Sequence, residues 1–403
     1  MDVKRIIWLL LILIPINTWA INLYSPKYII FDNTEDKVLL ENGSNTNVSI
    51  ASLTKIMTAM VIIDGTNDLD KKVTITRNML KAVPSSALTI NLKSGEVYTY
   101  RDLLYAIMLP SAADAAIALS MSYSGSINNF VNLMNKKAKD LGMQNTVFTN
   151  PIGMDNNNNR ATLSDLLKLL KYALKNDTFR TIYMTKYYTM HNNKKIYTSL
   201  IAYNEDLGLH LDTSRMIGSK TGYTSKAGMN LSELFISHNH EIISITVGAK
   251  HNNSSYHLQD GITIINYVDN NYDNHVLLEN NALLKEIEVR DSTIDKYPIY
   301  SDREIIKFLK NDYNHDDFKI EYHLPEYITY KTEKDIGNID YYFGDELLYS
   351  QKIIIQEEIK PNFISIIKDN ILYIIGGFML LILIIVLIIL RKKYKRKHLL
   401  ETN

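Results

Sequence analysis

The sequence contains no cysteine among its 403 residues. Disulfide bonds and thiolate metal sites are therefore excluded, and each folded domain has to be stabilised by an ordinary hydrophobic core. The chain also carries no excess charge, because 44 Lys and Arg residues balance 44 Asp and Glu residues. This balance gives no indication of a polyanionic partner, so no binding to nucleic acid is predicted.

A clustered set of metal ligands is lacking as well. The 10 histidines are scattered along the chain, and His238 and His240 fall in a polar hairpin turn where solvated side chains are expected. A zinc peptidase needs histidine and carboxylate ligands that converge on a single ion. The sequence therefore predicts no metal site and no cofactor.

Long apolar runs are lacking except at the two ends of the chain. At the start, Lys4 and Arg5 precede an apolar run over residues 6–14, and the segment ends at Ala20, a small residue suited to cleavage. This order is typical of a secretory signal peptide, which we predict over residues 1–20. An uncleaved anchor is the alternative, but the run is too short to cross a hydrocarbon core of about 30 Å comfortably.

At the other end, residues 371–390 contain no charged side chain. A helix of this length, with a rise of about 1.5 Å per residue, crosses a bilayer. The Lys and Arg cluster that follows predicts a cytoplasmic C-terminus by the positive-inside rule. We therefore predict a transmembrane helix over residues 367–391, a basic cytoplasmic tail over 392–403 and an extracytoplasmic location for what precedes them. An interfacial helix is disfavoured because the segment is apolar all round.

The residues between these ends are numerous enough for two domains. In the first, over 21–275, strands are expected at 27–33, 37–41, 229–237 and 241–247, and helices at 52–63, 101–108, 114–121, 129–141, 162–173 and 255–268. The pattern changes after residue 276 to short β-like segments with few helical repeats. We predict a β-rich domain over 276–366 that acts as a spacer.

Three short motifs are weak signals singly, but their order and spacing along the chain indicate a catalytic site. They are Ser52-Leu53-Thr54-Lys55, Ser111-Ala112-Ala113 and Lys220-Thr221-Gly222. On a helix, Ser52 and Lys55 share one face, which brings the amino group within reach of the hydroxyl. A serine hydroxyl becomes a nucleophile when a base removes its proton, and a lysine with a lowered pKa can be that base. A second cation such as Lys220 would lower this pKa. The motifs predict an acyl-transfer site.

The spacing Ser-x-x-Lys is common by chance, and this chain has a second copy at Ser365 and Lys368. That copy lies just before the apolar run and has no partner motifs, so we interpret it as structural. Ser52 differs because it begins a helix after a hairpin. Lys220-Thr221-Gly222 is expected in an edge strand, where Gly222 lets a substrate backbone approach closely.

With these motifs in place, the chain resembles the D-alanyl-D-alanine carboxypeptidases among the low-molecular-mass penicillin-binding proteins. The resemblance extends over residues 28–32, 51–58, 134–138, 141–143, 150–155 and 220–228. It implies an α+β fold with a β-lactamase/transpeptidase-like domain, an antiparallel sheet flanked by helices, followed by a small β-rich domain. It also implies peptidoglycan stem peptides as substrates and β-lactams as inhibitors.

The resemblance further implies roles for individual residues. Ser52 would attack the carbonyl of the penultimate D-alanine, Lys55 would act as base, and Ser111 would relay a proton to the leaving nitrogen. The released product would be D-alanine, and water would hydrolyse the acyl-enzyme.

On the substrate-binding side, the resemblance implies that Lys220 tunes the local field and that Thr221 holds the terminal carboxylate. The backbone N–H groups of Ser52 and Tyr223 would form the oxyanion hole, where one donor contributes about 3 kcal/mol in comparable sites. Gly222 has no side chain, so the substrate backbone could approach the strand closely at this position.

Two positions depart from the family pattern. The middle motif of the family is Ser-x-Asn, but Ala113 occupies the third position, and Lys250 stands where the family often has arginine. Loss of the asparagine amide would cost on the order of 1 kcal/mol, although Asn150 or Asn204 could supply another amide. Lys250 would keep the charge but lose bidentate geometry.

Two alternatives therefore stay open. One is a weakened penicillin-binding homologue that acts as a cell-wall scaffold or sensor. The other is a β-lactamase, which needs an added carboxylate to activate water. Asp155 and Asp165 lie in the relevant region, but we expect Asp165 to fix its helix, and a membrane anchor favours a cell-wall substrate.

Overall fold

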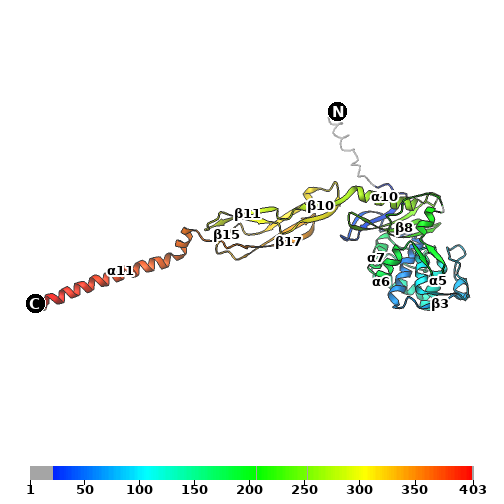
Figure 1. The fold of residues 1–403 in the computed structure, drawn as a ribbon, viewed down its shortest axis with the longest axis horizontal. Coiled ribbons are helices and arrows are strands. Elements are labelled where there is room, and N and C mark those ends of the chain that lie inside the picture. Colours follow the sequence, from blue (N-terminus) through cyan, green and yellow to red (C-terminus); the bar gives the residue numbers. More distant parts are fainter. Residues whose placement is uncertain (1–20, 206, 252, 402–403) are drawn as a thin grey trace, which may run out of the picture. The chain divides into compact units, whose positions relative to one another are not determined.

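The structure, a computed structural model, describes residues 21–205, 207–251 and 253–401 (Figure 1). The predicted signal peptide, residues 1–20, and the last residues of the predicted basic tail, 402–403, lie outside the described residues. Contacts divide the chain into two compact units, of which the first ends at Tyr272 and the second begins at Asp273.

The first unit is organised around a five-stranded antiparallel sheet. In spatial order the strands are β2 (Lys37–Asn42), β1 (Lys27–Asp32), β9 (His240–Ala249), β8 (Gly228–Ser237) and β7 (Gly218–Thr224). Strand β1 pairs both with β2 and with β9, so the N-terminal hairpin joins the sheet beside a strand from the far end of the unit. Among the described strands β7 pairs with β8 alone, which places it at the edge of the sheet, as predicted.

Several helices of this unit are capped by side chains or by glycine. The helices of the unit are α2 (Thr54–Gly65), α3 (Arg77–Lys81), α4 (Tyr100–Met108), α5 (Ala113–Ser124), α6 (Ile127–Asp140), α7 (Leu163–Leu174), α8 (Asp177–Met184), α9 (Ser199–Glu205) and α10 (Tyr256–Asn271). The side chains of Thr99, Ser126 and Thr162 each accept a hydrogen bond from a backbone N–H three residues later, which satisfies an otherwise unpaired donor. Gly125 caps the end of helix α5 with a φ of 81°, a conformation that suits glycine.

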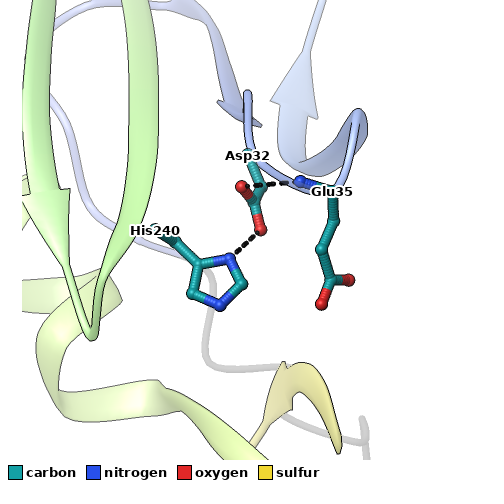
Figure 2. A group of neighbouring side chains, drawn as sticks. All are labelled: Asp32, Glu35 and His240. Carbon is teal, nitrogen blue, oxygen red and sulfur yellow. Dashed lines mark hydrogen bonds and ion pairs between the residues drawn. The ribbon is translucent and has the colours of Figure 1, made fainter.

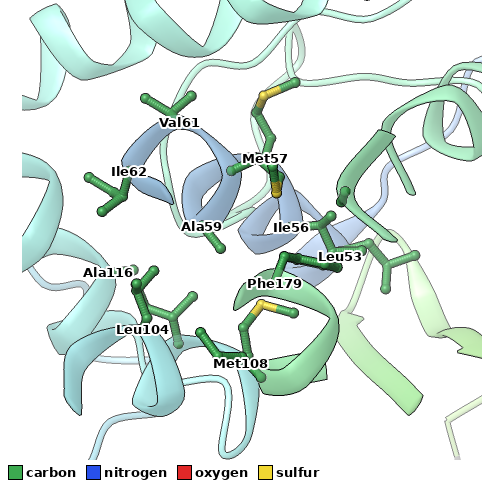
Figure 3. Packing of buried hydrophobic residues seen from close by; sticks show 14 of the residues in the cluster. Leu53, Ile56, Met57, Ala59, Val61, Ile62, Leu104, Met108, Ala116 and Phe179 are labelled. Atoms are coloured by element: carbon green, nitrogen blue, oxygen red, sulfur yellow. The ribbon is translucent and has the colours of Figure 1, made fainter. Parts of the chain in front are cut away.

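Helix α2 is buried on all sides, which fixes the residues at its start. Residues 54–63 are all buried, and the sequence is apolar around the whole circumference rather than on one stripe. Figure 3 shows Met57 and Ala59 of this helix surrounded by Leu104, Ala116 and Phe179 from neighbouring helices. Because each large buried apolar side chain contributes about 2 kcal/mol, α2 forms a rigid base for Ser52 and Lys55.

The sheet carries helices on both faces. Successive residues of a strand point to opposite faces, and β8 shows this at two neighbouring positions. Leu234 belongs to the large hydrophobic core that contains α2. Glu233 faces the other way, toward α10, since a Cβ placed on Gly261 would lie 2.5 Å from its Oε2. The first unit is therefore an α+β domain with an antiparallel sheet between two helical layers.

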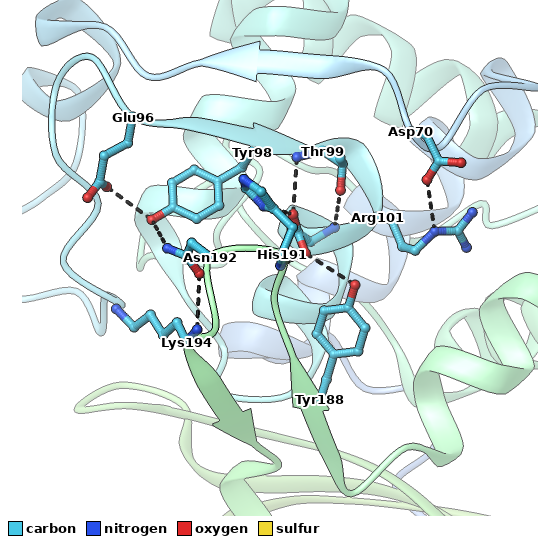
Figure 4. Close-up of polar contacts among 10 residues, drawn as sticks. Asp70, Glu96, Tyr98, Thr99, Arg101, Tyr188, His191, Asn192 and Lys194 are labelled. Carbon is cyan, nitrogen blue, oxygen red and sulfur yellow. Dashed lines mark hydrogen bonds and ion pairs between the residues drawn. The ribbon is translucent and has the colours of Figure 1, made fainter.

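A small hairpin, β5 (Tyr187–Thr189) and β6 (Lys195–Tyr197), is attached to the start of α4 through one buried carboxylate. Asp102 accepts hydrogen bonds from the Tyr188 hydroxyl at 3.1 Å and from His191, whose Nδ1 lies 2.6 Å away. Figure 4 shows Tyr188 and His191 pointing from the hairpin toward the Thr99 turn. Burial alone would raise the pKa of Asp102, but the hydrogen bonds from His191 and Thr99 lower it.

The second unit is rich in β-structure. Its strands are β10 (Tyr272–Leu278), which begins at the last residue of the first unit, β11 (Leu283–Arg290), β12 (Lys296–Tyr300), β13 (Ile305–Lys310), β14 (Phe318–His323), β15 (Tyr327–Thr329), β16 (Asp335–Phe343) and β17 (Glu346–Ile354). Ile287, Ile328 and Ile339 are among the residues of a separate hydrophobic core. Tyr341 is also part of that core and donates a hydrogen bond to Gln351 at 2.6 Å.

The chain ends in helix α11 (Phe363–Glu401), which contains the segment predicted to cross a membrane. Its residues Phe363–Tyr394 form a helix long and apolar enough for a bilayer, and none of the most apolar window is buried in the protein. Tyr330 and Lys331 of the β-rich part both contact Asp369 in the first turns of this helix. The apolar helix is compatible with membrane anchoring.

The sequence missed several short elements of the first unit, among them α8, α9 and the β5–β6 hairpin. Each is short and follows a polar or Tyr-rich segment, so hydrophobic periodicity gives little signal over its length. They matter because α8 and α9 both contact β7. The predicted strands and helices elsewhere begin and end within a few residues of the observed ones.

Candidate active site

Ser52 lies in a tight turn that leads directly into α2. The turn is the 3₁₀ helix η1 (Ala51–Leu53), and Ser52 remains partly exposed while its neighbours Ala51 and Leu53 are buried. Ala51 has a φ of 45°, a strained value for a residue other than glycine. The strain is sustained by the buried surroundings and presents the Ser52 side chain at the surface of the core.

Lys55 is hydrogen-bonded to Ser52. Its Nζ donates to Ser52 Oγ at 2.8 Å and to the carbonyl of Ile152 at 2.8 Å. The side chain is almost completely buried, and this burial lowers the pKa of Lys55 to about 7, although the carboxylate of Asp114 opposes the shift. Near neutral pH a large fraction of Lys55 is therefore unprotonated, which is the state that can accept a proton from serine.

The loop at 150–154 holds the second acceptor of Lys55 in place. Asn150 Oδ1 accepts hydrogen bonds from the backbone N–H groups of Ile152, Gly153 and Met154 at 3.2, 2.8 and 3.0 Å. Gly153 has a φ of 83°, and a Cβ at this position would lie 1.9 Å from the carbonyl oxygen of Ala51. The loop thus packs directly against the Ser52 turn, and only glycine fits the contact.

The edge strand β7 passes the other side of Ser52. A Cβ on Gly222 would lie 2.9 Å from the backbone nitrogen of Ser52, so the strand approaches the turn as closely as the sequence predicted. Lys220 is buried, and its Nζ donates to the carbonyl of Thr221 at 2.9 Å. Burial and then repulsion from Lys55 lower the pKa of Lys220.

The cause of the lowered pKa of Lys55 differs from the sequence interpretation. Proximity of Lys220 was expected to lower it, but the main cause is removal of Lys55 from water. The mutual repulsion of the two cations is instead visible at Lys220. Desolvation exceeds the repulsion because the elements packed around α2 remove Lys55 almost completely from water.

Ser199, which no sequence motif indicated, connects two parts of the site. Its hydroxyl forms a hydrogen bond with the hydroxyl of Thr221, and its backbone N–H donates to the carbonyl of Leu109 at 2.9 Å. Leu109 precedes the middle motif, so Ser199 joins that loop to β7. The available sequence signal was weak, because Ser199 only begins a short helix.

Ser111 lies in the loop between α4 and α5 in an unusual state. Its φ is 63°, its side chain is buried, and among the described residues its Oγ has no hydrogen-bond partner. A buried hydroxyl without a partner costs about 1–3 kcal/mol, and a positive φ adds strain. Such features gather at functional sites, where a substrate provides the missing partner.

Ala113 follows Ser111 by two positions and belongs to the hydrophobic core. Neither candidate amide replaces the missing asparagine side chain. Asn150 is engaged with its own loop, and Asn204 forms hydrogen bonds in both directions with the backbone of Leu211. The position is therefore apolar in this protein.

The two carboxylates considered for water activation have other partners. Asp165 is buried and accepts hydrogen bonds from the Asn145 backbone at 2.8 Å and from Thr146 at 3.0 Å, so it fixes the start of α7 as expected. Asp155 Oδ1 accepts from Ser49 and Thr224 at 2.7 and 2.9 Å. It thereby joins the segment before Ser52 to the end of β7.

Asp32, Glu35 and His240 form a group whose ligand atoms lie within 4.8 Å of one another, so they could hold a metal ion (Figure 2). The expectation that His240 is solvated is wrong, because its side chain is mostly buried and its Nδ1 lies 2.7 Å from Asp32 Oδ2. Asp32 Oδ1 accepts from the backbone N–H groups of Thr34 and Glu35. These bonds fix the β1–β2 turn against the β8–β9 turn, which gives the group a structural role.

The comparisons with known proteins agree with this geometry. The profile of a family described as D-alanyl-D-alanine carboxypeptidase matches residues 17–251, more than half of the chain. The D-alanyl-D-alanine carboxypeptidase DacF of Bacillus subtilis is 27% identical over 358 residues, which cover 84% of this chain and 87% of the relative. The D-alanyl-D-alanine carboxypeptidase of Streptomyces sp. strain K15 is 38% identical over 204 residues, which cover 47% of this chain and 69% of the relative.

The fold is likewise similar to solved structures. Penicillin binding protein 5 from Haemophilus influenzae matches with a TM-score of 0.59 at 22% identity, over 84% of this chain and 98% of that structure. At this identity the match shows the fold, whereas the profile match establishes the family. The chain belongs to the D-alanyl-D-alanine carboxypeptidase family, and its activity is that of a hydrolase.

Proposed function

We propose that this protein is a serine-type D-Ala-D-Ala carboxypeptidase that removes the terminal D-alanine of peptidoglycan stem peptides through an acyl-enzyme on Ser52. The observation that carries the proposal is the 2.8 Å hydrogen bond between Ser52 Oγ and the buried amine of Lys55. A hydroxyl beside a base whose pKa is about 7 is the arrangement that nucleophilic catalysis requires.

In the acylation step, neutral Lys55 takes the proton of Ser52 as Oγ attacks the carbonyl carbon of the penultimate D-alanine. The carbonyl of Ile152 already accepts one N–H of Lys55, which leaves the lone pair of the amine to be directed at Ser52. The C–N bond then breaks, and the leaving nitrogen receives a proton through Ser111. The buried Ser111 hydroxyl gains the partner that it lacks among the described residues.

Substrate binding uses the backbone of Ser52 and the edge strand. The N–H groups of Ser52 and Tyr223 form the oxyanion hole, and the close approach of Gly222 to the Ser52 nitrogen supports this assignment. Thr221 holds the terminal carboxylate, with Ser199 orienting its hydroxyl. Lys220 contributes positive potential near this carboxylate.

Deacylation reverses the proton movements. By the time D-alanine departs, Lys55 has passed the proton of Ser52 through Ser111 to the leaving nitrogen and is neutral again. It then removes a proton from a water molecule that attacks the ester carbonyl. The ester C–O bond breaks, Ser52 Oγ takes the proton back from Lys55, and the product is the shortened stem peptide with a new C-terminal carboxylate. No carboxylate near the site is required, which agrees with the structural roles of Asp155 and Asp165.

We further propose that the protein acts outside the cytoplasm, with a cleaved signal peptide and with the helix that begins at Phe363 as its single membrane span. In chain order the β-rich unit lies between the catalytic unit and this helix, so we assign it the role of a spacer that allows the active site to reach the wall. β-Lactams would inhibit the enzyme by acylating Ser52.

The test is mass spectrometry of the full chain in detergent. A fluorescent penicillin and a diacetyl-Lys-D-Ala-D-Ala peptide are offered to the native protein and to Ser52→Ala. We expect a penicilloyl adduct on Ser52 and release of D-alanine, and both should disappear in the variant. An adduct located on another residue would contradict the proposal.

The second candidate function is a scaffold or sensor that binds penicillin or stem peptides with little turnover. It is favoured by one observation, the apolar Ala113 in place of the family asparagine. The same experiment separates the two functions. A penicilloyl adduct without release of D-alanine would support the scaffold or sensor.

A further inference from the structure

A cleft of about 270 Å³ lies beyond the end of β7, next to the segment that leads to Ser52. Its polar lining consists of Lys27 at the start of β1, Asn47 and Ser49 before η1, and Lys226 in the β7–β8 turn. The remaining lining residues, which include Val247, are apolar or glycine. The cleft therefore combines an apolar floor with two cationic groups.

The two lysines have no anionic partner among the residues that the structure describes, within 21–401. The stem of Lys27 is held in place, since a Cβ on Gly43 would lie 3.0 Å from its Cγ. Asp155, which is hydrogen-bonded to Ser49 and Thr224 beside the cleft, is not among the residues that line it. Two like charges around one cleft repel each other, and an anion between them relieves the repulsion.

The direction of a bound substrate leads to this cleft, an argument that rests on the proposed function. If Thr221 holds the C-terminal carboxylate and the N–H of Tyr223 binds the reacting carbonyl, the substrate runs antiparallel to β7. Residues before the scissile bond then pass Thr224 and approach the β7–β8 turn. Lys226 lies in the turn that directly follows Thr224, so its long side chain is placed to meet a substrate residue two or three positions before the scissile bond.

We propose that this Lys226 cleft binds the free carboxylate of an acidic residue located two or three positions before the scissile bond of the stem peptide. Lys27 and Lys226 would contact the carboxylate, the Asn47 amide would donate a hydrogen bond, and the apolar floor would receive the methylene groups. The cleft thus favours stem peptides that carry a negative charge before the scissile bond, whereas the rest of the site recognises the D-Ala-D-Ala end.

The test compares two peptides that differ only in this charge, acetyl-γ-D-glutamyl-L-lysyl-D-Ala-D-Ala and its D-isoglutaminyl counterpart. With the full chain in detergent, kcat/KM should be higher for the acid than for the amide. Lys226→Gln should lower the acid-to-amide ratio about fivefold, and the double variant Lys27→Gln, Lys226→Gln should lower it further. The preference should also weaken at high salt.

The control variant is Lys139→Gln, which removes an exposed lysine at the end of α6 and should leave the ratio unchanged. A ratio that stays unchanged in the double variant would overturn the proposal. An equal loss for both peptides would overturn it too, because that result would show a structural role of the lysines.

A binding measurement separates this inference from the proposed function. Calorimetry with Ser52→Ala gives the affinity for both peptides without turnover. If the native protein forms no penicilloyl adduct and releases no D-alanine, the proposed function fails, yet the affinity ratio still tests the cleft. Equal affinities for acid and amide in Ser52→Ala would refute the cleft even where the enzyme is active.

Discussion

The chain contains the pattern Ser-x-x-Lys twice, and the two copies have opposite environments. In the first, Lys55 is buried and donates to Ser52 Oγ. In the second, Lys368 is exposed, and Ser365 is buried with its Oγ donating to Asn362 at 2.9 Å. The hydroxyl of one copy is available to a base, whereas the hydroxyl of the other takes part in a helix cap.

The comparison teaches that spacing supplies proximity but not reactivity. Both lysines lie one helical turn after their serine, yet only Lys55 is enclosed by a hydrophobic helix cluster that favours its neutral form. Reactivity in this chain is therefore a property of the packing around α2, of the 150–154 loop and of β7. The following changes test that conclusion.

The largest effect is expected from removing each lysine in turn. Lys55→Met keeps the apolar stem but removes the base, and it should lower the rate of acylation by penicillin by about 10²–10⁴-fold. Lys368→Met should leave the rate unchanged. Stopped-flow fluorescence with a labelled penicillin gives both rates, and circular dichroism checks the fold. Equal effects of the two variants would refute the distinction between the copies.

The pH dependence of the reaction should follow the titration of Lys55. Its pKa is lowered to about 7, and the base works only when neutral, so acylation should rise with pH through about 7 and then level off. Two pH units below the pKa the neutral fraction is about 1%, which predicts roughly a hundredfold loss at pH 5. Rates measured between pH 5 and 9 test this, and a profile that falls with rising pH over this interval would contradict the role of Lys55.

Glycines near the two copies should differ in their tolerance of a methyl group. A Cβ on Gly222 would lie 2.9 Å from the Ser52 nitrogen, whereas a Cβ on Gly376 in α11 would meet nothing within 4 Å. Gly222→Ala should slow acylation by about tenfold or more because it displaces an oxyanion donor. Gly376→Ala serves as the matched control and should have no effect on the rate.

The smallest effect is expected at the cap of the second copy. The Asn362 side chain accepts hydrogen bonds from both the N–H and the hydroxyl of Ser365. Asn362→Ala should destabilise the start of α11 by about 1 kcal/mol, visible as faster hydrogen exchange of the Ser365 amide, with acylation unaltered. A slower acylation would mean that the second copy is coupled to the catalytic site.

Much of the fold was predictable because its elements carry strong local patterns. The β1–β2 hairpin, the apolar helix α2 and the edge position of β7 follow from periodicity, turn residues and motif order. The α+β class and the family follow from the same motifs. The proximity of Ser52 and Lys55 was also predictable, because their spacing places them one helical turn apart.

Other parts of the site depend on distant contacts that a sequence pattern does not reveal. Ser199 acts through one hydroxyl and one backbone N–H, and serine is too common to attract notice. The buried state of His240 depends on Asp32, which lies 208 positions away in the sequence. Burial is the main cause of the lowered pKa of Lys55. It depends on the helices that pack around α2, and no local sequence pattern reveals these contacts.

The side chain of Asn150 should slow amide hydrogen exchange in the loop that it holds. The 150–154 segment is neither helix nor strand, yet one carbonyl oxygen protects the amides of Ile152, Gly153 and Met154. Irregular segments normally open readily and exchange their amide hydrogens quickly. In this protein those amides should instead exchange as slowly as the helices around them, so the acceptor that positions Lys55 is already in place before any substrate arrives.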